Sequence, residues 1–377
     1  RLLFGTYKGN YYEPEATLSY EDQVSRLIEH HMQVSSKKDA AAFLSKVNYY
    51  RLTGYALQFR DETGQDYFEG TSFETVRNIY RFDTELRGIL RDALDEAEGA
   101  FRTHIANGFS MIKCSKSPYD GHYDLENFYR KELYRSVMES LKREEERRED
   151  SLVVQHHKRC YGDTLPLWVI VEMLSFSSLS TLYSAMYLSE QDKIATMRGQ
   201  TAKVMKNHMH VLTVLRNKCS HGRRLYNTPL HPSVMLGSGY LRNHPEVGCD
   251  TLFAGILALM RNLPERESKI LLYNRLCTCL TKYAASIDLS CIGFPANYKQ
   301  LLQIELSNPD GKQNRCAFLT WKSTAVFRNI FTAPHSSPQQ HAQVHRIEPV
   351  KGLLLQRTAR APLPVVEPDQ HKGQPVR

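Results

Sequence analysis

Hydrophobic residues along this chain recur mainly every three or four positions, which is the spacing of one face of an α-helix. The longest such run spans residues 71–109, where Thr71 or Ser72 can cap the first turn and apolar side chains follow at helical spacing. Shorter runs predict further helices at 17–34, 37–52, 125–162, 167–187 and 201–221, and one or two more within 250–285. Alternating strand patterns are almost absent, so we predict an all-α fold built as a multi-helix bundle.

Changes in composition divide the chain into three parts. We predict a helical segment at residues 1–70, a helical core at 71–305 and a Pro-rich basic tail at 306–377, with residues 192–200 as a short connector inside the core. Seven of the sixteen Pro residues lie beyond position 333, among Gln, His and Ser. A segment of this composition buries too little apolar surface to fold alone, so we expect the tail to be disordered.

The distribution of charge limits where a nucleic acid could bind. The chain has a net charge of +8, but residues 315–377 hold nine Lys and Arg against three Asp and Glu, which leaves only +2 for the first 314 residues. A nucleic-acid surface on the folded part must therefore come from local clustering of cations rather than from overall charge.

Cysteine spacing argues against a zinc site, and hydropathy argues against a membrane-spanning helix. The eight Cys include no C-x2-C pair, which argues against a zinc site and suits the reduced thiols of a cytosolic protein. His156, His157 and Cys160 lie close together in the sequence, but we interpret them as a polar helix edge. No apolar run reaches the ~18 residues of a spanning helix. We expect a soluble, cytoplasmic protein with no metal, no other cofactor and no membrane partner.

An Arg-x4-His motif occurs at two places. Arg26 and His31 form the first match, among apolar neighbours typical of an ordinary amphipathic helix. Arg216 and His221 form the second, at the polar end of a predicted helix, and we favour this one. The pairing suits RNA cleavage without a metal, because Arg can hold a phosphate and His can transfer protons near neutral pH. The alternative is a solvated basic helix end.

Polar and basic residues around the favoured motif extend the candidate site. We predict that Asn217 acts with Arg216 and His221 in catalysis and that Ser220 supports them. The candidate RNA-binding residues are Lys218, Arg223, Arg224 and Asn227. Earlier in the chain, Glu98 and Arg102 share one helix face. These two residues form either a simple ion pair or a support beside the Arg216/His221 site.

Helix geometry separates the two principal residues of the motif. Five residues advance an ideal helix by about 500°, which leaves the side chains of Arg216 and His221 roughly 140° apart. The Arg side chain can reach round the helix, the helix can unwind before Gly222, or the partner residue can come from a second chain. Gly222 fits the left-handed position that follows many helices.

Five blocks of this sequence, in order, resemble one known family. The blocks are YYRLTGY at 49–55, YRFDTELR at 80–87, LPLWVIVEMLSF at 165–176, LRNKCSHGRRLYN at 215–227 and IGFPANY at 292–298. They are similar to those of abortive-infection proteins of the AbiD/AbiF type, which belong to the HEPN superfamily (higher eukaryotes and prokaryotes nucleotide-binding). Ser177 and Tyr298 depart from the family pattern, which usually has Gly and Trp there.

This resemblance implies a bacterial phage-defence toxin with a HEPN-like helical core. Members with an Arg-x4-His motif are expected to be metal-independent endoribonucleases, and the family's Arg, polar residue and His correspond to Arg216, Asn217 and His221. We expect RNA as the substrate, 2′,3′-cyclic phosphate ends on the products and a small RNA as a second candidate partner. One His cannot easily act as base and acid together, so we predict a homodimer with a composite site.

A second interpretation comes from another functional class. A HEPN-like helical body can bind RNA, or serve as a scaffold or regulatory protein, without catalysing a reaction. The basic tail would then carry the function, and deletion of residues 309–377 would abolish it. A metalloenzyme is the third interpretation, and the absence of ligand spacing argues against it.

Overall fold

The computed structural model describes residues 7–8, 11–12, 17–162 and 164–307. By its internal contacts the chain divides into two units, Arg1–Lys322 and Ser323–Arg377, and everything described below belongs to the first. The predicted disorder of the tail falls almost entirely outside the described residues. The predicted boundary between residues 70 and 71 stays a prediction.

The all-α prediction is confirmed. Among the described residues, the only strands are β1 (Tyr7–Lys8) and β2 (Tyr11–Tyr12), which form one short antiparallel pair. The helices are α1 (Tyr20–Glu29), α2 (Lys37–Leu44), α3 (Tyr49–Ala56), α4 (Phe73–Lys113), α5 (Lys131–Arg147), α6 (Leu152–Tyr161), α7 (Leu167–Met173), α8 (Phe176–Ala185), α9 (Leu188–Thr196), α10 (Ala202–Ser220), α11 (Ser238–Asn243), α12 (Leu252–Asn262), α13 (Arg266–Lys282) and α14 (Tyr298–Ser307). Single 3-10 turns lie at η1 (Leu57–Phe59), η2 (Leu125–Asn127) and η3 (Leu289–Ile292).

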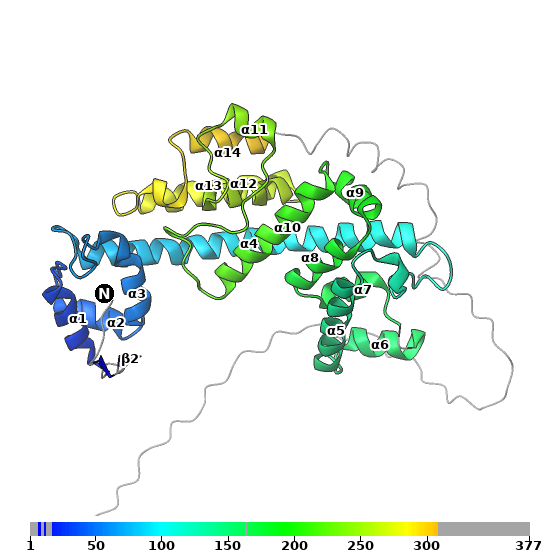
Figure 1. Ribbon diagram of the computed structural model, residues 1–377, viewed down its shortest axis with the longest axis horizontal. Coiled ribbons are helices and arrows are strands. Elements are labelled where there is room, and N and C mark those ends of the chain that lie inside the picture. Colours follow the sequence, from blue (N-terminus) through cyan, green and yellow to red (C-terminus); the bar gives the residue numbers. More distant parts are fainter. Residues whose placement is uncertain (1–6, 9–10, 13–16, 163, 308–377) are drawn as a thin grey trace, which may run out of the picture. The chain divides into compact units, whose positions relative to one another are not determined.

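Helix α4 is the central element of the fold. It is 41 residues long, and the Ser72 side chain caps it by accepting a hydrogen bond from the backbone N–H of Thr75 at 3.1 Å. Its apolar stripe is fully buried at Phe82, Phe101 and Phe109, and burying each such side chain contributes roughly 1.5–3 kcal/mol. Helices α3, α7, α9, α10 and α13 all pack on α4, and Figure 1 shows α10 crossing its middle.

Two long helices predicted from the sequence are interrupted by short polar residues. The predicted helix at 37–52 is divided into α2 and α3, because Asn48 caps a new helix by accepting from the N–H of Arg51 at 3.3 Å. The predicted helix at 167–187 is divided in the same way by Ser175, which accepts from the N–H of Ser178 at 3.0 Å. Each of these side chains accepts an N–H group of the new first turn and so stabilises the start of a second helix. The hydrophobic period alone does not reveal these breaks.

Other boundaries also differ from the prediction. The predicted helix at 125–162 is three elements, η2, α5 and α6. The predicted connector at 192–200 is wrong, because α9 occupies most of it and packs its buried Ile194 against α4. Gly108 makes this approach possible, since a Cβ atom there would lie 2.7 Å from Cγ1 of Ile194. None of the described helices combines the length and apolarity needed to cross a bilayer.

The helix that carries the favoured motif forms as predicted. Thr201 caps α10 by accepting from the N–H of Val204 at 3.4 Å, and the helix runs to Ser220. Gly222 follows with φ of +62°, the left-handed conformation that glycine adopts without strain. The N–H of Arg223 donates to the carbonyl of Lys218 at 2.9 Å and closes the helix end.

Candidate functional site at the end of helix α10

The structure brings Glu98 and Arg216 together, although they lie on different helices. Glu98 is on α4, Arg216 is on the last turns of α10, and Oε2 of Glu98 lies 3.6 Å from Nε of Arg216. The second carboxylate oxygen of Glu98 forms an ion pair with Arg102, one turn further along α4. Arg102 also donates to the carbonyl of Val171 in α7. The predicted Glu98–Arg102 ion pair is therefore present, and it also contacts the motif.

Glu98 holds Arg216 from one side only. The Glu98 side chain is 8% exposed, whereas 34% of the Arg216 side chain is exposed. The Nε atom of Arg216 is enclosed and forms no hydrogen bond, so the exposed surface belongs to other atoms of the side chain. Among the described residues, the Arg216 side chain has the ion pair with Glu98 and no hydrogen bond. Its terminal nitrogens are therefore available to an anion.

His221 lies immediately after the last helical residue. Its backbone N–H donates to the carbonyl of Asn217 at 3.0 Å, and its side chain is exposed. Within the described residues the imidazole has no hydrogen-bond partner. Because α10 stays regular to Ser220, early unwinding of the helix, one of the three alternatives raised from the sequence, is not seen. Arg216 faces α4, and His221 faces solvent at the helix end.

The loop after the motif is anchored by a buried carboxylate. Asp83 on α4 is completely buried and accepts the backbone N–H groups of Leu225 and Tyr226, at 3.1 and 2.8 Å. It also accepts the hydroxyl of Tyr55 at 2.6 Å and forms an ion pair with Arg87. Burial raises the pKa of Asp83, and the adjacent Arg87 opposes that rise. Asp83 thus fixes the path of the chain just beyond His221.

Helix α3 contacts the same loop through two arginines. Arg51 on α3 donates from Nη1 to the carbonyl of Gly222 at 3.2 Å. In the opposite direction, Arg224 on the loop donates to the carbonyl of Gly54 on α3. These two bonds join the YYRLTGY block to the block that contains the motif.

The structure divides the predicted RNA-binding residues into two groups. Lys218 donates to the carbonyl of Pro229 at 3.2 Å, and burial, with a contribution from Arg223, lowers its pKa. Arg224 is half-buried by its contact with α3. Arg223 and Asn227 are exposed, as predicted for groups that meet a ligand. Arg223 is therefore the predicted RNA-binding cation that is most accessible.

The two remaining predicted site residues lie on the same helix end. Asn217 is half-buried, and its backbone carbonyl accepts the N–H of His221. Ser220 is exposed. The side chains of both residues are without a hydrogen-bond partner among the described residues. Their predicted roles in catalysis and support stay predictions.

Sequence reasoning did not select Asp83, Arg87, Tyr55 or Arg51 as site residues. A signal was present for two of them, because Asp83 and Arg87 interrupt the apolar stripe of α4 with charges four residues apart. Charged residues at core positions are rarely buried unless they are paired. Nothing local in the sequence links Arg51 to Gly222, since that contact depends on how α3 packs.

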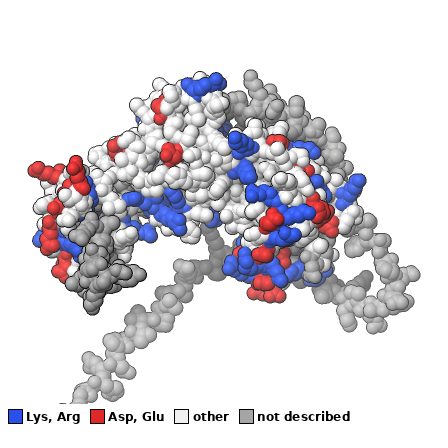
Figure 2. All heavy atoms as spheres, in the orientation of Figure 1, with Lys and Arg blue, Asp and Glu red and all other residues white. Residues whose placement is uncertain are grey.

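Cations gather around this end of α10. Figure 2 shows Lys and Arg atoms clustered over the part of the surface where Figure 1 places the end of α10 beside α4. Arg51 contacts Gly222 at this helix end, Arg216 lies in the last turns of α10 and Arg223 follows in the loop. Within the described residues, the two carboxylates that bond to the motif and its loop, Asp83 and Glu98, are both buried. The exposed surface is therefore locally basic, as a phosphate-binding surface must be.

The first Arg-x4-His match lies in a different environment. Arg26 is in α1, and His31 follows that helix with Nδ1 3.9 Å from a carboxylate oxygen of Asp66. No described hydrogen bond or ion pair joins this match to Arg216 or His221. His31 thus lies beside a carboxylate, unlike His221, and we do not include this match in the candidate site.

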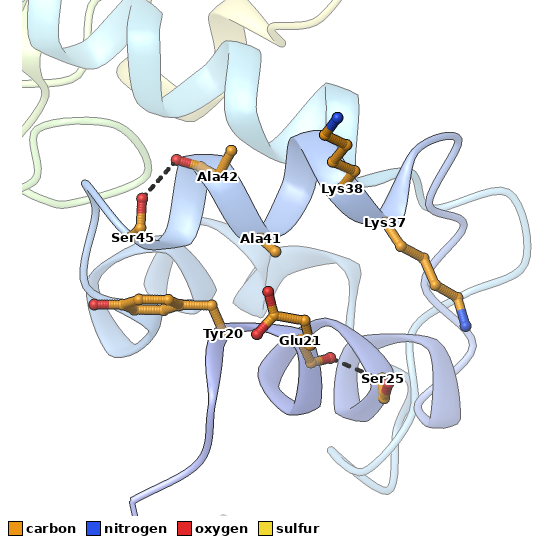
Figure 3. Close-up of a pocket in the computed structure, with 8 residues that line it drawn as sticks. All are labelled: Tyr20, Glu21, Ser25, Lys37, Lys38, Ala41, Ala42 and Ser45. Carbon is orange, nitrogen blue, oxygen red and sulfur yellow. Dashed lines mark hydrogen bonds between the residues drawn. The ribbon is translucent and has the colours of Figure 1, made fainter.

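A groove between α1 and α2 lies apart from the Arg216/His221 site. Its lining residues, drawn in Figure 3, include Tyr20, Glu21 and Ser25 of α1 and Lys37 and Lys38 of α2. The groove encloses about 530 Å³ and shares no lining residue with that site. Within the described residues, no group of three or more His, Cys, Asp or Glu could hold a metal ion.

Part of the chain matches a known family model. The family model of the Abi-like proteins matches residues 42–227, a segment that runs from α2 to the loop after His221. Searches among curated proteins and among solved structures returned no match. The matched segment includes Arg51, Asp83, Glu98, Arg216 and His221. Over residues 42–227, the chain is therefore similar to the Abi-like proteins.

Proposed function

We propose that this protein acts in abortive infection as a metal-independent endoribonuclease of the HEPN type. The match to the Abi-like family supports the role in abortive infection, a bacterial defence against phage. The arrangement of Arg216 and His221 supports the chemistry. A guanidinium with free donors and an exposed imidazole lie at the same helix end, over a locally basic surface.

The proposed reaction uses the 2′-hydroxyl of RNA as the nucleophile. A general base removes the proton of the 2′-hydroxyl, whose oxygen attacks the adjacent phosphorus. The bond to the 5′-oxygen of the next nucleotide breaks, and a general acid protonates that oxygen. The products carry a 2′,3′-cyclic phosphate and a 5′-hydroxyl, and no water or metal is consumed.

Each residue of the motif has one role in this scheme. His221 is the general base or acid, which contributes roughly 10²–10⁴-fold to the rate. Arg216 binds the phosphate and stabilises the extra negative charge of the transition state. Glu98 keeps the guanidinium of Arg216 oriented by holding its Nε side. Asn217 and Ser220 lie next to these groups and support them, and Lys218, Arg223, Arg224 and Asn227 form or shape the RNA-binding surface.

We further propose that the active form is a homodimer. A single chain supplies one exposed His at this site, whereas the reaction needs a base and an acid at the same phosphate. Two chains related by a two-fold axis would bring two copies of His221 and Arg216 to one cleft. RNA is the substrate, and a small RNA is a second candidate partner.

The alternative is a HEPN-like protein that binds RNA, or acts as a scaffold or regulator, without cutting. The hydrogen bonds of the half-buried Lys218 and Arg224 to backbone carbonyls are compatible with it, because part of the basic cluster then maintains the fold. Cleavage assays on a chain without residues 309–377 separate the two functions. A nuclease keeps its activity after this deletion, whereas a binder that depends on the tail loses its affinity for RNA.

The proposed mechanism is tested by the end groups of the products and by the need for a 2′-hydroxyl at the cleaved position. A mixed-sequence single-stranded RNA is incubated with the full chain in EDTA, and the cleaved positions and end groups are determined. The same RNA is then prepared with 2′-deoxy nucleotides at those positions. We expect cyclic phosphate ends and complete resistance of the 2′-deoxy substrate. Cleavage of the 2′-deoxy substrate, or 3′-hydroxyl ends, would contradict the proposed mechanism.

A further inference from the structure

Helix α3 brings an additional arginine to the end of α10. Arg51 donates from Nη1 to the carbonyl of Gly222, the residue that directly follows His221. A Cβ atom on Gly222 would lie 3.0 Å from Nη1 of Arg51, so the guanidinium rests close against this backbone. An exposed cation from the N-terminal part of the chain is thereby placed one residue away from the proposed catalytic imidazole.

Most of the hydrogen-bonding capacity of Arg51 is unused. A guanidinium has five N–H donors, and the contact with Gly222 occupies one of them. Arg51 is exposed and forms no ion pair with any carboxylate of the described residues. The remaining N–H groups are therefore available to a ligand.

The position of Arg51 is fixed by contacts on both sides. Arg224 donates back from the loop to Gly54 of α3. The hydroxyl of Tyr55, also on α3, donates to the buried Asp83, which in turn holds the loop. Because α3 and the loop are joined at three points, Arg51 is held in place relative to His221 before any ligand arrives.

We propose that Arg51 is a further substrate-binding residue, which contacts a backbone phosphate of single-stranded RNA beside His221. This inference rests on the proposed ribonuclease function only in its choice of RNA as the ligand. Arg216 binds the phosphate that reacts, and Arg51 binds a neighbouring phosphate and sets the register of the strand. The N-terminal helical segment is then a part of the RNA-binding site rather than a separate module.

The test measures RNA binding in a chain that cannot cut. The full-length His221→Ala protein is the parent, and its affinity for a labelled mixed-sequence single-stranded RNA is measured over a range of salt concentrations. Arg51→Gln keeps a donor for the Gly222 carbonyl but removes the charge, and Arg51→Lys keeps the charge. Arg135→Gln is the matched control, because Arg135 is an exposed arginine on α5, which packs on α7 and α8. Thermal unfolding of each variant checks that the fold is intact.

We expect Arg51→Gln to weaken RNA binding by roughly 10-fold at low salt, because the variant loses one charged hydrogen bond to the RNA. The slope of log affinity against log salt should fall by about 0.7, the value for one phosphate of a single strand. Arg51→Lys should lose less affinity than Arg51→Gln, and Arg135→Gln should match the parent.

Three results would overturn the inference. In the first, Arg51→Gln binds RNA as tightly as the parent. In the second, Arg51→Gln and Arg51→Lys lose the same affinity and the salt slope does not change. In the third, the parent shows no salt-sensitive binding of RNA. Failure of the proposed function would look different. The wild-type chain would then cut no RNA, while the dependence of binding on Arg51 would remain measurable.

Discussion

Glu98 on α4 holds Arg216 on α10 by the Nε side of the guanidinium, with 3.6 Å between Oε2 and Nε. The same carboxylate is paired with Arg102. One buried carboxylate thus pairs with two cations, and Arg216 keeps its terminal donors free. This arrangement orients an arginine toward solvent without neutralising its outer edge.

Replacement of Glu98 by Gln should impair catalysis more than RNA binding. The glutamine side chain has nearly the same size but lacks the charge that orients Arg216, so we expect kcat to fall by roughly 10-fold or more. The RNA affinity should stay within a few fold, since removal of a negative charge favours an anionic ligand. Steady-state kinetics on the RNA substrate separate kcat from KM.

Glu96→Gln is the control for this prediction. Glu96 is an exposed carboxylate on the same helix, close to Glu98 in the sequence. The Glu96 variant should behave as the wild type does. Equal kinetics in the two variants would show that Glu98 does not position Arg216.

Replacement of Asp83 by Ala should destabilise the protein strongly. The change leaves the buried guanidinium of Arg87 without its carboxylate and removes the acceptor of the Leu225 and Tyr226 N–H groups. Loss of one partner of a buried pair costs about 3–5 kcal/mol. Urea unfolding of Asp83→Ala and of Asp95→Ala, an exposed carboxylate on the same helix, measures the difference. A loss below about 1 kcal/mol in Asp83→Ala would show that the buried network does not stabilise the fold.

Gly222 should tolerate alanine less well than another glycine with positive φ. Both Gly222 and Gly64 have φ above +60°, but only Gly222 has a neighbour, Nη1 of Arg51, near the position of the added Cβ. The left-handed backbone alone costs roughly 1–2 kcal/mol in each alanine variant. Gly222→Ala should also reduce RNA cleavage, because it displaces Arg51, whereas Gly64→Ala should leave cleavage unchanged. Equal activity of the two variants would argue against a role for the Arg51 contact.

The buried His208 should make the stability of the fold sensitive to acid. Its Nε2 lies 2.9 Å from the carbonyl oxygen of Met235 and its Nδ1 lies 2.9 Å from Nδ2 of Asn262, so the neutral ring donates to the first and accepts from the second. Burial lowers the pKa of His208 to about 4, from about 6.5 in an unfolded chain. Because the folded pKa is the lower one, the stabilisation is complete above about pH 6.5 and is lost as the pH falls toward 4.

The size of this effect follows from the shift of the pKa of His208. A shift from about 6.5 to about 4 corresponds to roughly 3 kcal/mol. Urea unfolding at several pH values should show a steeper loss below about pH 6.5 for the wild type than for His208→Asn. Burial also lowers the pKa of His104 and His122, so some acid sensitivity should remain in that variant. Identical pH profiles for the two proteins would contradict the assignment to His208.

The sequence predicts those parts of the fold that depend on local patterns. The length of α4 follows from its apolar period and from the Ser72 cap, and the end of α10 follows from Gly222. The breaks at Asn48 and Ser175 were not predicted, because a short polar side chain can either cap a new helix or lie on the surface of a continuous one. The presence of α9 was missed because its sequence carries few apolar residues.

The candidate site divides in a similar way. Arg216 and His221 could be proposed from residue chemistry, and the proximity of Glu98 could be raised only as one of two alternatives. The contact of Lys218 with the Pro229 carbonyl depends on the path of the following loop, and the contact of Arg224 with Gly54 depends on packing between distant segments. Because a basic side chain looks the same in sequence whether it holds a loop or meets a phosphate, only the fold separates these roles.

The most direct test of the central claim compares the replacement of His221, at the end of α10, with the replacement of His210, within α10. Cleavage of single-stranded RNA in EDTA is measured for the wild type, for His221→Ala and for His210→Ala, an exposed histidine on the same helix. We predict equal cleavage by the wild type and His210→Ala, and a loss of at least about 100-fold in His221→Ala. Cleavage by His221→Ala at the wild-type rate, or an absence of cleavage by the wild type in EDTA, would contradict the assignment of a metal-independent ribonuclease to this site.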